Sequence, residues 1–218
     1  MTEKKLSFTH RFIPATDPAI TETLLLLHGT GGNENDLLGL GNRLRPGAAL
    51  LSPRGKVLEN GMPRFFRRLA EGVFDTEDVK RQSHALADFV AEAAKAYGLD
   101  EHNITAVGYS NGANIAGGLL LLRPETLSAA ALLRPMVPLL PEKQPDLRGK
   151  DILILSGRAD PIATPAETAR LVKLFTDAGA GVKAHTQVGG HQLGQEDIRA
   201  AEHWFTSRSA KAGANAPA

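Results

Sequence analysis

The sequence predicts an α/β fold: a mostly parallel, twisted sheet with helices on both faces and no large separate cap domain. Short apolar runs alternate with stretches of helical periodicity, and Gly-rich loops join them. The 218 residues suffice for one sizeable core, which we expect to occupy residues 1–207 as a single domain. A content of 42% hydrophobic and 22% charged residues is typical of a globular protein.

Seven short segments are predicted to be strands. Most are rich in Leu, Ile, Val or Ala and are followed closely by glycine or proline. The expected strands are 6–13, 21–27, 48–52, 103–109, 127–133, 151–155 and 181–187. The first alternates apolar and polar residues as an edge strand does, whereas 21–27 is a continuous apolar run typical of a buried strand.

Helices are expected between these strands, where apolar residues recur every three to four positions. The predicted helices lie at 37–40, 77–97, 111–122, 165–179 and 194–207. The polar residues 33–36 are expected to cap the first helix, and Thr164, Pro165 and Glu167 are typical of a helix start.

Two segments do not fit the alternation. Residues 56–76 have no clean period but hold several aromatic and arginine residues, so we expect a long functional loop that covers a substrate pocket. Residues 208–218 are mostly Ala, Ser and Gly, and we expect a disordered tail there.

Composition excludes several classes of function. The net charge of +1 gives no electrostatic case for a nucleic-acid partner or an anionic membrane surface. Apolar runs such as 24–27 and 119–122 are far too short for membrane insertion. The chain has no cysteine, which rules out disulfides, a thiolate nucleophile and a cysteine-based metal site. Because residues 1–12 lack an apolar core of signal-peptide length, we expect a cytoplasmic protein, and no metal site is predicted.

The central motif is Gly-Tyr-Ser-Asn-Gly at 108–112. An apolar strand enters it and a helix rich in small residues leaves it, which is the layout of a nucleophile elbow. Such a turn brings the backbone close to itself, and glycine at 108 and 112 would avoid a collision there. The motif predicts Ser110 as a nucleophile, although an ordinary Gly-rich turn with an uninvolved serine can have the same pattern.

A serine nucleophile needs a base, and in sheets with this elbow the chain order is Ser, then Asp, then His. The histidines after Ser110 are His185, His191 and His203. His185 falls inside a predicted strand and His203 inside a predicted helix. His191 follows a strand and two glycines, so we predict that it is the general base.

The third member of the triad must lie between these two residues in the chain. The aspartates there are Asp146, Asp151, Asp160 and Asp177. Asp146 belongs to a proline-rich loop, and Asp151 and Asp177 are expected at the opposite edge of the sheet. Asp160 follows the carboxyl end of a strand, where ligands bind in such sheets. We therefore predict that Asp160 orients His191.

The oxyanion of an acyl-transfer intermediate needs two preorganised donors. One is expected to be the backbone N–H of Asn111, directly after the nucleophile, and the other the N–H of Thr30 in the Gly-rich loop after strand 21–27. His28 at the start of that loop is expected to hold it by hydrogen bonds.

Five motifs together carry a resemblance to a known family. They are Leu-His-Gly-Thr-Gly-Gly at 27–32, Pro-Arg-Gly at 53–55, the elbow at 108–112, Gly-Arg-Ala-Asp-Pro at 157–161 and Gly-His at 190–191. With these motifs in this order, the chain resembles the phospholipase/carboxylesterase family of α/β-hydrolases, which includes acyl-protein thioesterases. The resemblance implies the α/β-hydrolase fold, a serine hydrolase without a cofactor, and a possible homodimer.

Asn111 indicates a branch within that family. The thioesterase branch usually has Gln after the serine, whereas the chain resembles the bacterial Gly-Tyr-Ser-Asn-Gly branch, with its small-ester carboxylesterases and hydroquinone- or catechol-linked hydrolases. In size and fold it also resembles dienelactone hydrolases, but their nucleophile is a cysteine.

Four further residues are candidates for substrate contact. Phe65 and Phe66 in segment 56–76 are expected to be walls of the pocket, and Met136 is expected to line its acyl side. Arg54, like Arg64 and Arg134, can meet a substrate carboxylate or form salt bridges on the rim. Ordinary packing is the alternative for the two phenylalanines and the methionine.

The expected function is that of a serine carboxylesterase acting on small-molecule esters with short-to-medium acyl or aryl groups, through an acyl-enzyme. An alternative is a hydrolase of aromatic, hydroquinone-derived or ring-fission substrates, which the arginines and phenylalanines of 56–76 would favour. A different class is a small-molecule-binding homologue without catalysis.

Overall fold

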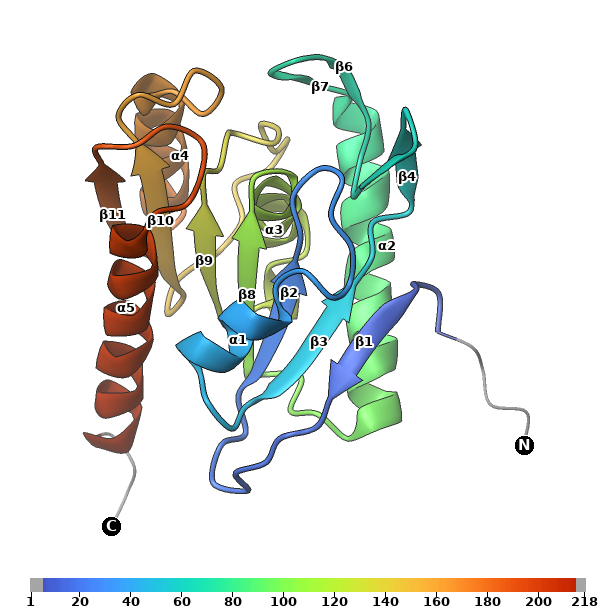
Figure 1. The fold of residues 1–218 in the computed structure, drawn as a ribbon, viewed down its shortest axis with the longest axis vertical. Coiled ribbons are helices and arrows are strands. Elements are labelled where there is room, and N and C mark those ends of the chain that lie inside the picture. The colour runs from blue at the N-terminus through green and yellow to red at the C-terminus, as the bar shows by residue number, and fades with distance from the viewer. Residues whose placement is uncertain (1–5, 215–218) are drawn as a thin grey trace.

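The computed structural model of the chain describes residues 6–214, and their side chains as far as Arg208. At its centre lies a seven-stranded sheet in the order β1-β3-β2-β8-β9-β10-β11 (Figure 1). Its strands are β1 (His10–Ile13), β2 (Thr23–Leu27), β3 (Ala49–Pro53), β8 (Ile104–Tyr109), β9 (Ala129–Leu133), β10 (Asp151–Gly157) and β11 (Gly181–Gln187). The pair β1–β3 is antiparallel and the other five pairs are parallel, so the predicted mostly parallel sheet is confirmed.

Helices cover both faces of this sheet, as predicted (Figure 1). They are α1 (Leu38–Leu44), α2 (Thr76–Tyr97), α3 (Asn111–Leu122), α4 (Pro165–Asp177) and α5 (Gln195–Ala214), with a short 3₁₀ turn η1 (Pro124–Thr126). Helices α1 and α5 lie on one face, and α2, α3 and α4 on the other. Side chains of β2 alternate between the two resulting cores: Leu25 and Leu27 pack toward α2 and α3, and Leu24 and Leu26 toward α1 and α5.

Two of the helices, α2 and α4, begin directly after a residue whose side chain caps them. Asp75 accepts a hydrogen bond from Asp78 N–H at the start of α2, and Thr164 does the same for Glu167 N–H at the start of α4. Residues 33–36 form a turn instead of the predicted cap, so α1 begins only at Leu38 and without a side-chain cap. Helix α5 continues past residue 207 to Ala214, so the predicted tail is helical in part, and residues 215–218 lie outside the described residues.

The segment 56–76 is more regular than the predicted loop. It forms two hairpins, β4 (Val57–Glu59) with β5 (Met62–Arg64), and β6 (Arg68–Ala70) with β7 (Val73–Phe74). Asn60 and Gly61 join the first pair with positive φ values of 52° and 79°, the conformation of a type I′ turn. Both hairpins rise above the edge at which the parallel strands end (Figure 1).

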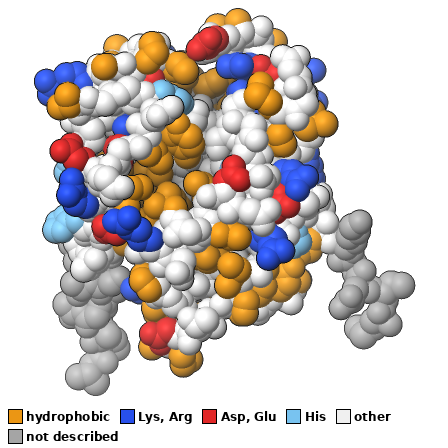
Figure 2. Space-filling model, viewed as in Figure 1, with side chains coloured by type: hydrophobic (Ala, Val, Ile, Leu, Met, Phe, Trp, Pro, Cys, Tyr) orange, Lys and Arg blue, Asp and Glu red, His pale blue; other side chains and the backbone are white. Residues whose placement is uncertain are grey.

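The surface agrees with the near-neutral composition. On the face seen in Figure 2, positive and negative side chains are interspersed. Within residues 6–214, every helix is too short or too polar to span a bilayer.

Candidate active site

Ser110 lies between the end of β8 and the first residue of α3. Its φ is 51°, a value that costs a non-glycine residue of order 1–3 kcal/mol and is found at tight functional turns. A Cβ at Gly112 would lie 1.9 Å from the Leu27 carbonyl oxygen, and one at Gly108 would lie 2.5 Å from the Gly112 carbonyl oxygen. Both glycines are therefore required by close backbone approach, as the sequence predicted.

The three residues predicted as a triad meet in one hydrogen-bonded chain. His191 Nε2 lies 2.8 Å from Ser110 Oγ, and His191 Nδ1 lies 2.8 Å from Asp160 Oδ2. The other carboxylate oxygen of Asp160 accepts the N–H groups of Ile162 and Ala163 at 2.8 and 3.0 Å. The buried carboxylate favours the tautomer with the proton on Nδ1, which leaves Nε2 free to accept the serine proton.

Arg134, at the end of β9, holds the loop that carries His191. It is only 1% exposed and forms a bidentate pair with Asp197 of α5, at 2.9 and 2.7 Å. It also donates from Nε to Gly190 O and from Nη2 to Gln192 O, on either side of the histidine. The sequence offered Arg134 as a rim or substrate-binding residue, and nothing in the sequence indicated its pairing with Asp197.

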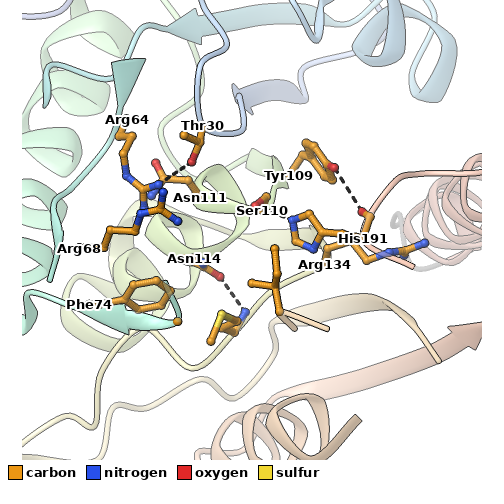
Figure 3. A pocket seen from close by; sticks show the side chains of 13 residues that line it. Thr30, Arg64, Arg68, Phe74, Tyr109, Ser110, Asn111, Asn114, Arg134 and His191 are labelled. Atoms are coloured by element: carbon orange, nitrogen blue, oxygen red, sulfur yellow. Dashed lines mark hydrogen bonds between the residues drawn. The ribbon is translucent and has the colours of Figure 1, made fainter. Parts of the chain in front are cut away.

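Tyr109 adds a further contact to the same loop. Its hydroxyl group donates to the His191 carbonyl oxygen at 3.2 Å, and its side chain lines the cavity beside Ser110 (Figure 3). Burial raises the pKa of this phenol, which keeps the hydroxyl group a proton donor. The residue before the nucleophile thus supports the base, a role that the elbow motif alone does not indicate.

The loop after β2 lies next to the elbow, since Gly29 approaches Tyr109 closely. Thr30 lines the same cavity as Ser110 and Asn111. The loop is tied to the first hairpin by two bonds: Gly31 N–H donates to Pro63 O at 2.9 Å, and Arg64 Nη1 donates to Thr30 Oγ1 at 2.6 Å. These two bonds fix the Thr30 loop against the first hairpin, in the lining of the cavity that holds Ser110.

His28 braces the start of this loop. Its Nδ1 donates to Gly29 O at 2.7 Å, and its Nε2 accepts Gly55 N–H at 3.0 Å. Burial lowers the pKa of His28, with smaller opposing effects from Gly29, Asp36 and Glu34. The neutral ring therefore bridges two Gly turns, the arrangement expected for a histidine that holds the loop.

The cavity beside Ser110 has a volume of about 220 Å³. Met136 and Phe74 line it, together with Arg64 and Arg68 of the hairpins and Ile162 (Figure 3). Residues of both hairpins thus line the cavity, and so does Met136; its predicted place on the acyl side stays a prediction.

Three predicted substrate contacts lie elsewhere. Phe65 and Phe66 are 2% and 0% exposed and belong to the core under the hairpins, so the phenylalanine that lines the cavity is Phe74. Phe65 packs on the His28 ring, with centroids 4.8 Å apart, because its side chain points inward from the hairpin. Arg54 is bound to Glu34 through Nε and Nη2 and does not line the cavity. The prediction of these three as pocket residues is corrected accordingly.

The described residues contain no group of three or more His, Asp and Glu side chains that could hold a metal ion. The chemistry that this arrangement can perform is nucleophilic attack by Ser110 with proton transfer through His191.

Known proteins similar to the chain include carboxylesterases. A scan against models of known protein families gives no match. The Bacillus subtilis (strain 168) protein named "Putative hydrolase MhqD" is 48% identical over 182 residues, which cover 84% of this chain and 91% of that protein. The Bacillus cereus carboxylesterase structure has a TM-score of 0.90 and 46% identity, covering 93% of this chain and 95% of that one. For the Mesorhizobium loti carboxylesterase the TM-score is 0.85 and the identity 36%, with 93% and 96% covered. On this similarity, and with the five motifs in place, the chain belongs to the phospholipase/carboxylesterase family of α/β-hydrolases.

Proposed function

We propose that the protein is a serine carboxylesterase that hydrolyses short-to-medium acyl or aryl carboxylic esters through an acyl-enzyme. The observation that carries the proposal is the hydrogen-bonded chain from Asp160 through His191 to Ser110, which ends beside a cavity of about 220 Å³. Such a chain converts a weak hydroxyl nucleophile into a strong one.

The proposed reaction has two halves. Ser110 Oγ attacks the ester carbonyl carbon while its proton passes to His191 Nε2, and the backbone N–H groups of Thr30 and Asn111 hold the oxyanion. The tetrahedral intermediate collapses, the C–O bond to the alcohol breaks, and His191 gives the proton to the leaving alkoxide. Water then attacks the acyl-enzyme by the same route, and the acid leaves as Ser110 recovers its proton.

Ser110→Ala tests the nucleophile. We expect kcat on 4-nitrophenyl butyrate to fall by about 10⁴-fold or more, as for other triad nucleophiles. Ser207→Ala on α5 is the matched control, since Ser207 Oγ donates to the nearby Trp204 carbonyl oxygen and lies far along the helix from the site. A fluorophosphonate should label Ser110 in the parent protein. Full activity in Ser110→Ala, or labelling at another residue, would contradict the proposal.

A second candidate is a hydrolase of aromatic, hydroquinone-derived or ring-fission substrates. The presence of Phe74, Arg64 and Arg68 in the cavity lining favours it, because a ring can pack on Phe74 beside two cations. A panel that compares alkyl esters with aryl and acidic aromatic esters separates the two candidates by kcat/KM. Tight binding of such compounds without turnover would instead indicate the binding homologue.

We further propose a single domain, whose last helix α5 runs to Ala214 instead of ending at residue 207, a cytoplasmic location and a homodimer, the last on family resemblance alone. Light scattering of the purified protein measures the oligomeric state, and a monomer at all concentrations would contradict the dimer.

A further inference from the structure

One end of the cavity gathers hydrogen-bond donors. Arg64 and Arg68 lie side by side there, across Ser110 from His191 (Figure 3). Both form ion pairs with the same carboxylate: Arg64 Nε lies 3.1 Å from Glu59 Oε2, and Arg68 Nε donates to Glu59 Oε1 at 2.8 Å. Because two guanidinium groups pair with one carboxylate, this end of the cavity keeps one net positive charge.

The remaining bonds of Arg64 do not neutralise that charge. Its Nε also donates to Phe66 O at 3.1 Å and its Nη1 to Thr30 Oγ1, and both acceptors are neutral. Arg64 is only 3% exposed, and burial lowers its pKa, with a further decrease from Arg68 and an opposing increase from Glu59. A guanidinium nevertheless stays protonated under the conditions in which esters are assayed. The charge is therefore permanent and poorly solvated.

Asn111, which lines the same cavity, carries a buried donor without a partner in the part of the chain that the structure describes. The residue is 2% exposed, and its Oδ1 accepts Phe65 N–H at 2.7 Å. This bond distinguishes the Oδ1 end of the amide from the Nδ2 end. Within the described residues, the Nδ2 group has no hydrogen-bond partner although it is buried. A buried donor without an acceptor is destabilising, so its presence points to an acceptor that arrives with a ligand.

We propose that this end of the cavity binds a carboxylate group carried by the ester substrate. A carboxylate accepts from a guanidinium in the geometry that both groups prefer, and its second oxygen can accept from Asn111 Nδ2. Phe74 beside the arginines would pack on the chain or ring that joins the carboxylate to the scissile ester. The substrates selected by this site are half-esters of dicarboxylic acids, or esters of alcohols that bear a carboxylate. The inference rests on the proposed esterase function and names its substrate class.

Two matched pairs of esters test the inference. The first is the 4-nitrophenyl half-ester of adipic acid against 4-nitrophenyl hexanoate, which places the carboxylate or a methyl group on the acyl side. The second is 4-acetoxybenzoate against 4-methylphenyl acetate, which places them on the alcohol side. For each pair, the ratio of kcat/KM values is measured in the parent, in Arg68→Gln and in Arg67→Gln.

Arg67 is the matched control because it is exposed, pairs with Asp75 and does not line the cavity. We expect Arg68→Gln to lower the carboxylate-to-methyl ratio about 10-fold or more in at least one pair, and Arg67→Gln to leave both ratios unchanged. Adipate should also slow fluorophosphonate labelling of Ser110 in the parent, and less so in Arg68→Gln.

The outcomes separate this inference from the proposed function. Turnover of the neutral esters with ratios that do not change in Arg68→Gln would overturn the carboxylate site and leave the esterase standing. Equal losses of ratio in Arg67→Gln and Arg68→Gln would also overturn it, since a general charge effect would then be enough. No turnover of any ester and no labelling of Ser110 would contradict the esterase itself.

Discussion

Arginines flank Ser110 on two sides, and the two sides differ in how the positive charge is neutralised. On the His191 side, Arg134 has a carboxylate of its own, Asp197, and two backbone carbonyls. On the hairpin side, Arg64 and Arg68 share the single carboxylate of Glu59. All three arginines line one cavity. The number of carboxylates per arginine distinguishes Arg134, which holds a loop, from Arg64 and Arg68, which can bind a ligand.

Breaking the Arg134 pair should have the largest effect. Arg134→Met leaves Asp197 buried without its cation, for which we expect a loss of about 3–5 kcal/mol in the free energy of unfolding. The His191 loop also loses two anchors, so kcat should fall for neutral and acidic esters alike, with their ratio unchanged. Urea denaturation and steady-state kinetics measure both effects.

Arg148→Met is the control for this prediction, because Arg148 also pairs with an aspartate but both partners are exposed. It should change stability and activity little. The double variant Arg134→Met with Asp197→Leu should recover stability, since no buried charge is left unpaired, while kcat stays low because Gly190 and Gln192 remain unanchored. Recovery of kcat together with stability would show that Arg134 does not position the loop.

The same comparison shows what sequence reasoning could reach. The proposed triad is predictable because each member lies in the loop or turn that follows a parallel strand, and parallel strands end at one edge of the sheet. The pairing of Arg134 with Asp197 joins residues 63 positions apart, one after a strand and one within a helix, and no local pattern marks it.

The hairpins were the less predictable region for a related reason. Asn60-Gly61 is a strong hairpin signal, and it favours a hairpin over the loop predicted for 56–76. Which phenylalanine faces the cavity depends on the register of the short strands and on their docking on α3. The bond from Phe65 N–H to Asn111 Oδ1 sets that docking, so Phe65 and Phe66 are buried and Phe74 lines the cavity.

Acid should weaken the hairpin side through His28. The pKa of His28 is lowered by burial from its ordinary value of 6.5, so the unfolded chain takes up this proton at higher pH than the folded one. The contribution of His28 to stability is therefore complete above about pH 6.5 and is lost as the pH falls below it, by ~1.4 kcal/mol for each unit of pKa difference.

His28→Gln should make the free energy of unfolding less dependent on pH between about pH 5 and 6.5, because the titrating group is gone. His102→Gln is the control, as that side chain is exposed on the surface. Urea denaturation at a series of pH values measures the slopes. An equal pH dependence in His28→Gln and the parent would show that the bridge between Gly29 and Gly55 does not depend on the neutral ring.

The smallest expected effect is also the most direct test of the comparison. Glu59→Gln keeps an acceptor for Arg68 but removes the negative charge, so the hairpin wall changes from one unbalanced positive charge to two. Glu59 is partly exposed, and a charge interaction there is worth about 0.5–1 kcal/mol, so KM for a carboxylate-bearing ester should fall about 2- to 5-fold. KM for the matched neutral ester should not change, and added salt should reduce the difference. If KM for the acidic ester rises instead, Glu59 acts mainly by holding the two guanidinium groups in place. Arg64 and Arg68 would then be structural residues, as Arg134 is, and would not bind a ligand through an unbalanced charge.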